Sequence, residues 1–142
     1  MRSIQTADSV AQTYAAIHAV DLAAVPVMST DRYIPRKQQT ALARDLLKRL
    51  KIKGVSVTTP SYSMASTVEV RVPEHRPGFE GFERWENTCY SDMPDDVPAK
   101  LWNRRRYDAA QRLEQILLAA FPKHDDRSDS MTDYFDRKWS VD

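Results

Sequence analysis

The stretch that decides the fold is GVSVTTPSYSMASTVEVRV, residues 54–72. Two short runs within it, 55–58 and 68–72, alternate valines with polar side chains. Because successive side chains of a strand point to opposite faces, each run predicts a strand with one valine face. The proline and serines between the runs favour a turn. We therefore predict an antiparallel pair whose valine face must be covered by helices, since two strands alone are marginal in water.

Two segments before this pair have the periodicity of helices. Residues 7–20 carry apolar side chains at three- and four-residue steps among several alanines, which are the best helix formers. A second helix begins at Pro35, since proline is favoured at the first helical position, and we expect Gly54 to end it. Its apolar face consists of Leu42, Leu46, Leu47 and Leu50. The basic end of this helix is explained either by the helix dipole, which favours cations there, or by phosphate binding.

A third helix and a third strand follow. Residues 99–121 have helical periodicity, and residues 134–141 alternate apolar and polar side chains, which predicts a strand beside the pair. The apolar stripe of the helix comprises Leu113, Ile116, Leu117 and Ala120, extended toward the N-terminus by Leu101 and Tyr107. The predicted fold is one α+β domain over residues 1–142. It is a small antiparallel sheet of about three strands with helices packed on one face, in the order ααββαβ.

Composition limits the class of protein. A net charge of +1, with 29% charged and 42% hydrophobic residues, is typical of a folded globular chain and does not indicate a strongly basic nucleic-acid binder. Cys89 is the only cysteine, so no internal disulfide can form and a cytoplasmic location in a bacterial host is expected. The best apolar run, residues 19–28, is interrupted by Asp21 and Pro26, so we expect no signal peptide and no membrane span.

Residues 73–98 form a long loop rich in proline and aromatic residues. Loops of this length in compact domains are often functional, and large aromatic side chains commonly anchor a partner surface. The alternative is that the rings tuck back onto the core as a cover. With one tyrosine from the predicted turn, the expected partner-binding residues are Tyr62, Phe79, Phe82, Trp85 and Tyr90.

The third helix carries the best candidate for nucleic-acid binding, because cations and stacking aromatic rings are what backbone binding uses. Consecutive helical residues diverge by about 100°, however, so neighbouring arginines do not make one patch, and a solvated helical surface is the alternative. The residues of this second predicted interface are Lys100, Arg104, Arg105 and Arg112, with Lys51 and Lys53 in support.

Signals for catalysis are weak. Aspartates are dense between residues 125 and 136, and carboxylates suit hard cations, but Arg127 occupies a position where a calcium loop needs Asp or Asn. A polar turn with side-chain-to-backbone hydrogen bonds is the favoured explanation, and a metal-dependent hydrolase is the third hypothesis. It would use Asp125, Asp129 and Asp133. No zinc spacing, phosphate-binding loop, dinucleotide motif or nucleophile elbow is present. We expect neither enzymatic activity nor a cofactor.

Two stretches resemble a known group of proteins. One runs from Tyr33-Ile34-Pro35 through the leucine helix to the strand pair, and the other is RSDSMTDYFDRKWSV at residues 127–141. Both are similar to small domains associated with large polyvalent proteins of phages and conjugative elements. The resemblance implies a non-enzymatic accessory protein of a phage or plasmid.

On this interpretation the protein binds a host protein, for example to inhibit a nuclease-based defence system of the kind that anti-CRISPR or anti-restriction proteins block. The alternative is a nucleic-acid-binding accessory protein that uses the basic face of the third helix. A homodimer formed through the N-terminal helix is a further possibility.

Overall fold

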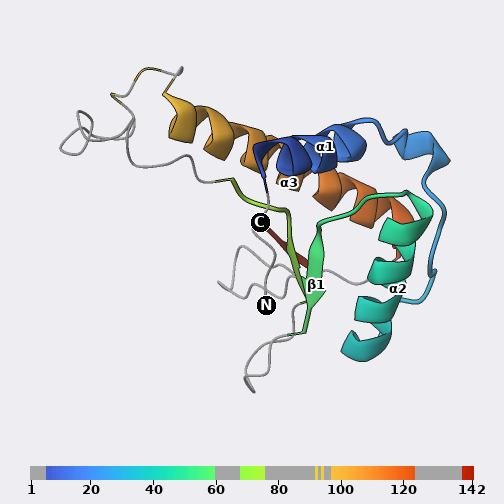
Figure 1. Cartoon of the computed structure of the whole chain (residues 1–142). Helices are drawn as coiled ribbons and strands as arrows, with labels where there is room; N and C mark the ends of the chain where they lie inside the picture. Colours follow the sequence, from blue (N-terminus) through green and yellow to red (C-terminus); the bar gives the residue numbers. More distant parts are fainter. Residues whose placement is uncertain (1–5, 60–67, 76–91, 93, 95–96, 124–138) are drawn as a thin grey trace.

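The two valine-rich segments form strands of a three-stranded sheet (Figure 1). The computed structural model describes residues 6–59, 68–75, 92, 94, 97–123 and 139–142. Strand β1 (Ser56–Thr58) pairs antiparallel with β2 (Val68–Arg71), and β3 (Trp139–Val141) pairs parallel with the other edge of β2. The strand order is therefore β1-β2-β3. The α+β class and the element order are confirmed.

The sheet is mixed, whereas the sequence led us to expect an antiparallel one. The chain leaves β2, passes through helix α3 (Pro98–Ala120) and then enters β3. A helix that crosses the sheet returns the chain to the end at which the previous strand began, so the two strands that it joins run parallel. Strand alternation predicts which face a residue lies on but carries no information about direction, which is why this feature was missed.

The buried side chains of the sheet lie on one of its two faces. Val57 lies opposite Val70, and Val68 lies opposite Trp139, so all four face the same side and all four are buried. The opposite face carries polar side chains, of which Ser56 is exposed. Within the described part of the chain the helices thus cover the valine face, as predicted, and the strands and α1, α2 and α3 contribute to one hydrophobic core.

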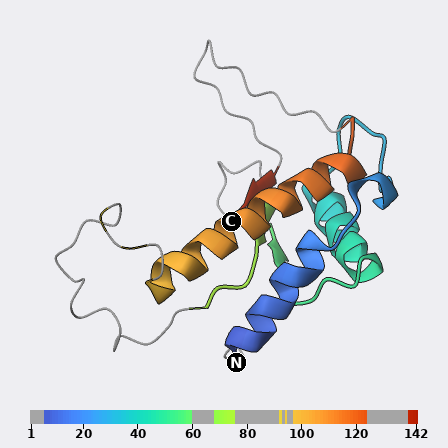
Figure 2. The ribbon, with the colours of Figure 1, turned by 90° about the horizontal axis from the view of Figure 1, so that it is seen from above.

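Helix α1 (Ala7–His18) packs against α3 and is followed by a short 3₁₀ turn, η1 (Leu22–Ala24) (Figure 2). The Thr6 side chain caps its first turn by accepting a hydrogen bond from the Ser9 backbone N–H at 3.1 Å. The apolar face of α1 is buried within its own chain. A homodimer through this helix stays a prediction, and it would have to compete with that packing.

Helix α2 (Arg36–Arg49) begins directly after Pro35 and ends before the predicted stop at Gly54. Its end is a Schellman motif: the Ile52 N–H donates to the Leu47 carbonyl at 2.9 Å, and the Lys51 N–H donates to the Lys48 carbonyl at 3.1 Å. Lys51 takes the left-handed position with φ of 57°, where glycine is usual. The prediction that Gly54 ends the helix was therefore wrong.

The apolar stripe of α3 differs from the predicted one in its N-terminal half. Leu113 and its neighbours are buried as expected, but Leu101 and Tyr107 are 45% and 62% exposed. At 100° per residue, Leu101 and Tyr107 each lie about 120° from Leu113, whereas Trp102 and Arg106 lie within about 20° of it. Trp102 and Arg106 are half-buried and continue the stripe. In the part of the chain that the structure describes, no helix combines the length and the apolarity that a membrane span requires.

Candidate functional site

The residues predicted to bind a partner lie outside the described residues, so those predictions stay open. They are Tyr62, Phe79, Phe82, Trp85 and Tyr90. The same holds for the aspartates of the hypothetical hydrolase, Asp125, Asp129 and Asp133. Within the described ranges, no group of three or more His, Cys, Asp or Glu side chains is placed to hold a metal ion.

The three consecutive arginines of α3 point to different neighbours, as their helical spacing predicts. The guanidinium of Arg105 lies over the Trp102 ring, 4.4 Å from its centroid. Arg106 pairs with Glu74 at 3.3 Å, and Arg104 is exposed. A stacked guanidinium is held in place by the ring and remains at the surface. Of the three consecutive arginines, Arg105 is therefore the one best placed to contact a phosphate group.

Arg112 instead has a structural role. One Nη of its guanidinium donates to the Val20 carbonyl at 2.7 Å, which joins α3 to the chain after α1. Its Nε is buried and has no hydrogen-bond partner in the described part of the chain. Arg112 is therefore half-buried and bonded to the chain after α1, while Arg104 and Arg105 are exposed, and binding of nucleic acid by this set stays a prediction.

Trp102 also belongs to an aromatic cluster beneath Arg105. His75 meets the Trp102 ring edge-on with centroids 4.7 Å apart, and the Tyr14 ring lies 6.3 Å from it. The Tyr14 hydroxyl donates to the Pro73 carbonyl, and burial raises the pKa of this phenol above its usual 10.0. Trp102 is thus engaged from several sides, which leaves less of its ring for stacking on a base.

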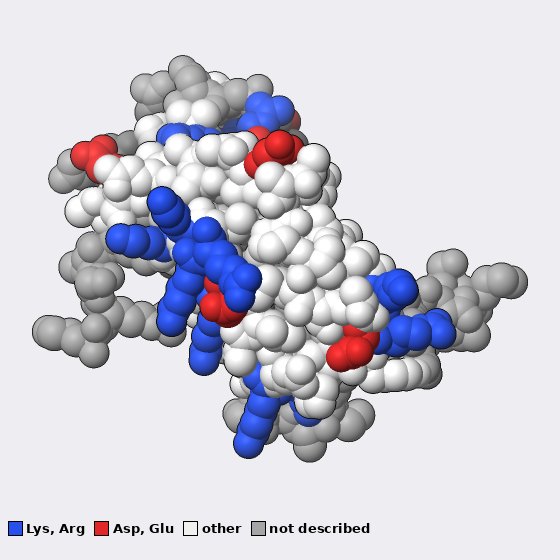
Figure 3. All heavy atoms as spheres, turned by 90° about the vertical axis from the view of Figure 1, so that its right-hand side faces the viewer, with Lys and Arg blue, Asp and Glu red and all other residues white. Residues whose placement is uncertain are grey.

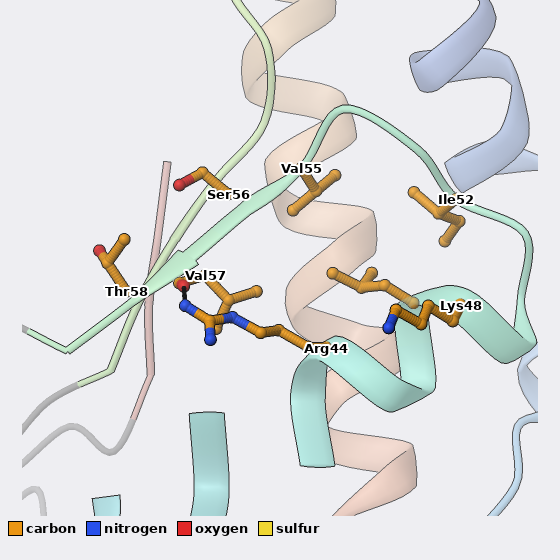
Figure 4. Close-up of a pocket in the computed structure, with 8 residues that line it drawn as sticks. Arg44, Lys48, Ile52, Val55, Ser56, Val57 and Thr58 are labelled. Atoms are coloured by element: carbon orange, nitrogen blue, oxygen red, sulfur yellow. Dashed lines mark hydrogen bonds between the residues drawn. The ribbon is translucent and has the colours of Figure 1, made fainter. Parts of the chain in front are cut away.

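A second site lies where α2 faces β1 (Figure 4). It is an open groove of about 400 Å³, which we call the cationic groove. Its lining residues are Arg44, Leu47, Lys48, Ile52, Val55, Ser56, Val57 and Thr58. From α2 the lining takes Arg44, Leu47 and Lys48, which lie within about one helical turn of each other. The turn after α2 leads the chain directly into β1. The two walls of the groove are therefore neighbours in the sequence, although they belong to different elements.

Apolar and cationic groups are separated within the cationic groove. Leu47, Ile52 and Val57 are each no more than 5% exposed, so they form an apolar floor that merges with the core. Arg44 and Lys48 are exposed and lie four residues apart, on the same side of α2. Figure 4 shows the Arg44 side chain reaching across to β1, where its Nη donates to the Val57 carbonyl at 2.8 Å.

The surroundings of the groove are strongly positive. Residues 36–53 contain seven Lys and Arg and one Asp, an excess of six positive charges in a chain whose net charge is +1. The single acid, Asp45, is paired with Arg49 at 3.0 Å. Figure 3 shows Lys and Arg side chains gathered on the face that carries α2. The Thr13 hydroxyl holds the following turn in place by donating to the Lys53 carbonyl at 2.7 Å.

The positive charge of this region is evident from the sequence, but the groove is not. Lys51 and Lys53 were assigned only a supporting role for α3, and the basic end of α2 was explained mainly by the helix dipole. The available signal was the four-residue spacing of Arg44 and Lys48 next to a strand that begins a few residues later. No protein-family model, curated protein or solved structure matches this chain.

Proposed function

We propose that the protein is a non-enzymatic binding module whose cationic groove receives an acidic segment of a partner protein. The observation that carries the proposal is an apolar floor beside a cationic rim. Val55 supplies accessible apolar surface above the buried Leu47 and Val57, and Arg44 supplies charge next to it. A phosphate backbone would use only the cations, whereas an acidic peptide with aliphatic side chains uses both.

The resemblance to domains of phage and conjugative-element proteins supports a host protein as the partner. A module of this kind would occupy an acidic surface of a host factor and block it, as an inhibitor of a nuclease-based defence does. The aromatic loop, with Phe82 and Trp85, is then a second predicted contact, and Tyr62 a third. The charge of the groove favours an acidic target in particular.

Affinity capture from a bacterial lysate after nuclease treatment tests the proposal. The bait is the full chain, compared with the double variant Arg44→Glu/Lys48→Glu. We expect a discrete protein to be retained by the parent chain, and at least tenfold less of it by the variant, since two attractive charge pairs become repulsive. Lys48→Glu alone leaves the Arg44–Val57 hydrogen bond intact and should cause a smaller loss in the same direction.

The matched control reverses two charges on the other basic surface, with Arg104→Glu/Arg105→Glu on α3. This variant should retain the partner as well as the parent chain does. Thermal unfolding of each variant confirms that it is folded at the capture temperature. Equal retention by the groove variant and the parent chain would refute the proposal.

Nucleic-acid binding is the second candidate, because the excess of six positive charges in residues 36–53 suits a polyanion. The exposed Arg105, held over Trp102, would extend such a surface. On duplex DNA, the logarithm of the affinity should then fall linearly with the logarithm of the salt concentration. Each phosphate neutralised contributes about 0.9 to that slope.

A salt titration with and without the groove variant separates the two candidates. Reversing the charges of Arg44 and Lys48 should lower the slope by about 2 if both contact phosphates. The protein partner is supported if a protein is retained after nuclease treatment and if the parent chain and the groove variant bind the oligonucleotide with the same affinity. Loss of all retained material on nuclease treatment would instead favour nucleic acid.

A further inference from the structure

Strand β1 directs backbone groups into the cationic groove. In the order β1-β2-β3, β1 has β2 on one side and α2 on the other. The N–H and C=O of one strand residue point to the same edge, and the Val57 carbonyl meets Arg44 on the α2 side. The Val57 backbone therefore faces the groove. An edge of this kind is a template for a further strand.

Arg44 is placed to protect this edge when no partner is present. Its guanidinium covers the Val57 carbonyl from an exposed side chain, so it can leave without disturbing the core. A guanidinium has five N–H donors in a fixed fork, which matches a carboxylate with two parallel hydrogen bonds. An incoming strand with a suitably placed carboxylate would offer Arg44 a stronger acceptor than the one it gives up.

We propose that an extended acidic segment of the partner adds to β1 as a further strand. A backbone N–H of the segment replaces Arg44 on the Val57 carbonyl, and Arg44 turns to a carboxylate of the same segment. This inference rests on the proposed function and specifies its binding mode. Side chains of a strand alternate between two faces, so aliphatic residues would reach the floor while acidic residues meet the rim.

The preferred segment therefore alternates acidic and branched aliphatic residues. Strand β2 already shows the pattern on the other side of β1, where Glu69 lies between Val68 and Val70. Lys48, one turn along α2 from Arg44, takes a second carboxylate. Since β1 comprises three residues, a pentapeptide is long enough to cover it.

The test titrates the ¹⁵N-labelled full chain with three synthetic peptides and follows the backbone amide signals. The acidic peptide is acetyl-EVEVE-amide, the neutral control is acetyl-QVQVQ-amide, and the third is the acidic peptide with alternate backbone nitrogens methylated on the edge that would face β1. We expect the acidic peptide to shift the Val57 amide and to bind about tenfold more tightly than the neutral one. Methylation should abolish binding, because it removes the donors that a ladder requires.

The variant Arg44→Ala tests whether the Arg44 side chain covers the edge of β1 or only supports the fold. Only the first role predicts a change in the affinity for the neutral peptide. Without the side chain that covers the Val57 carbonyl, the neutral peptide should bind the variant more tightly than it binds the parent chain. The preference for the acidic peptide should shrink at the same time. A neutral peptide that binds both chains equally would overturn the role of Arg44 as a displaceable cover.

The outcomes separate the binding mode from the proposed function. If the methylated and unmethylated acidic peptides bind equally, strand addition is overturned while an acidic partner in the groove still stands. If the acidic peptide shifts no groove amide and a 16-nucleotide DNA strand does, both proposals are overturned in favour of nucleic acid. A shift at Val57 that methylation abolishes supports both.

Discussion

A glycine at position 51 should make the protein more stable than an alanine there, although Lys51 lies in the most basic part of the chain. Its φ of 57° places it in the left-handed region, and the two Schellman hydrogen bonds fix it there. Ile52, the next residue, is 5% exposed, so the turn cannot relax without moving a core side chain. A residue with a Cβ is strained in this conformation by roughly 1–2 kcal/mol, and glycine is not.

The net gain is smaller than that strain, because glycine loses more backbone entropy on folding, by roughly 0.5–1 kcal/mol. Removing a cation from the end of a helix also costs about 0.3–1 kcal/mol. The comparison with Lys51→Ala cancels the charge effect, since both variants lose it. We expect Lys51→Gly to exceed Lys51→Ala in free energy of unfolding by about 1 kcal/mol.

Urea denaturation followed by circular dichroism at 222 nm measures this difference. In both variants the free energy of unfolding should fall with urea concentration as steeply as in the parent chain. The shift in the urea midpoint then reports stability alone. Lys51→Asn should fall between the two, since asparagine tolerates the left-handed region better than alanine. An alanine variant as stable as the glycine variant would refute the assignment of strain to this position.

Three further predictions concern the core and its caps. Leu113→Ala should lower the free energy of unfolding by about 3 kcal/mol, because the leucine is fully buried. Leu118 lies on the exposed side of α3, so Leu118→Ala should change that free energy by less than about 0.5 kcal/mol in the same urea titration. Thr6→Ala should cost about 1 kcal/mol through loss of the cap on Ser9, and Thr6→Ser should restore it, as measured by thermal unfolding. Tyr14→Phe should cost about 1–2 kcal/mol at neutral pH by leaving the buried Pro73 carbonyl unpaired. Because burial raises the pKa of Tyr14 in the folded state, its contribution is complete below pH 10.0 and is lost as the pH rises further, so the alkaline loss of stability should be smaller in the phenylalanine variant.

The sequence predicted the helices and strands because periodicity depends on local positions. Val57, Val68 and Val70 alternate clearly and all are buried. The stripe of α3 was misplaced where Leu101 and Tyr107 are apolar by type but lie on the wrong side of the helix. Trp102 and Arg106 occupy the buried side, and a half-buried arginine gives no apolar signal. The direction of β3 depends on how α3 crosses the sheet, which requires the whole topology.

The groove could not be predicted in the same way, because its two walls come from different elements. Arg44 is an ordinary solvent-facing cation in the helical pattern, and Val57 is an ordinary core valine in the strand pattern. Their hydrogen bond depends on how α2 sits beside the edge of β1. The excess positive charge of residues 36–53 and the four-residue spacing of Arg44 and Lys48 are visible in the sequence, and they were the local indications of this surface.

The parallel pairing of β2 with β3 also matters while the chain is being made. The ribosome must add residues 72–138 before β3 exists, which takes roughly 3–13 s at about 5–20 residues per second. During that time β1 and β2 can already pair, but the other edge of β2 lacks its own strand. A β3 segment from another copy that has already been made can compete for that edge. A high local concentration of copies therefore favours dimers that exchange β3, and a low concentration favours closure within one chain.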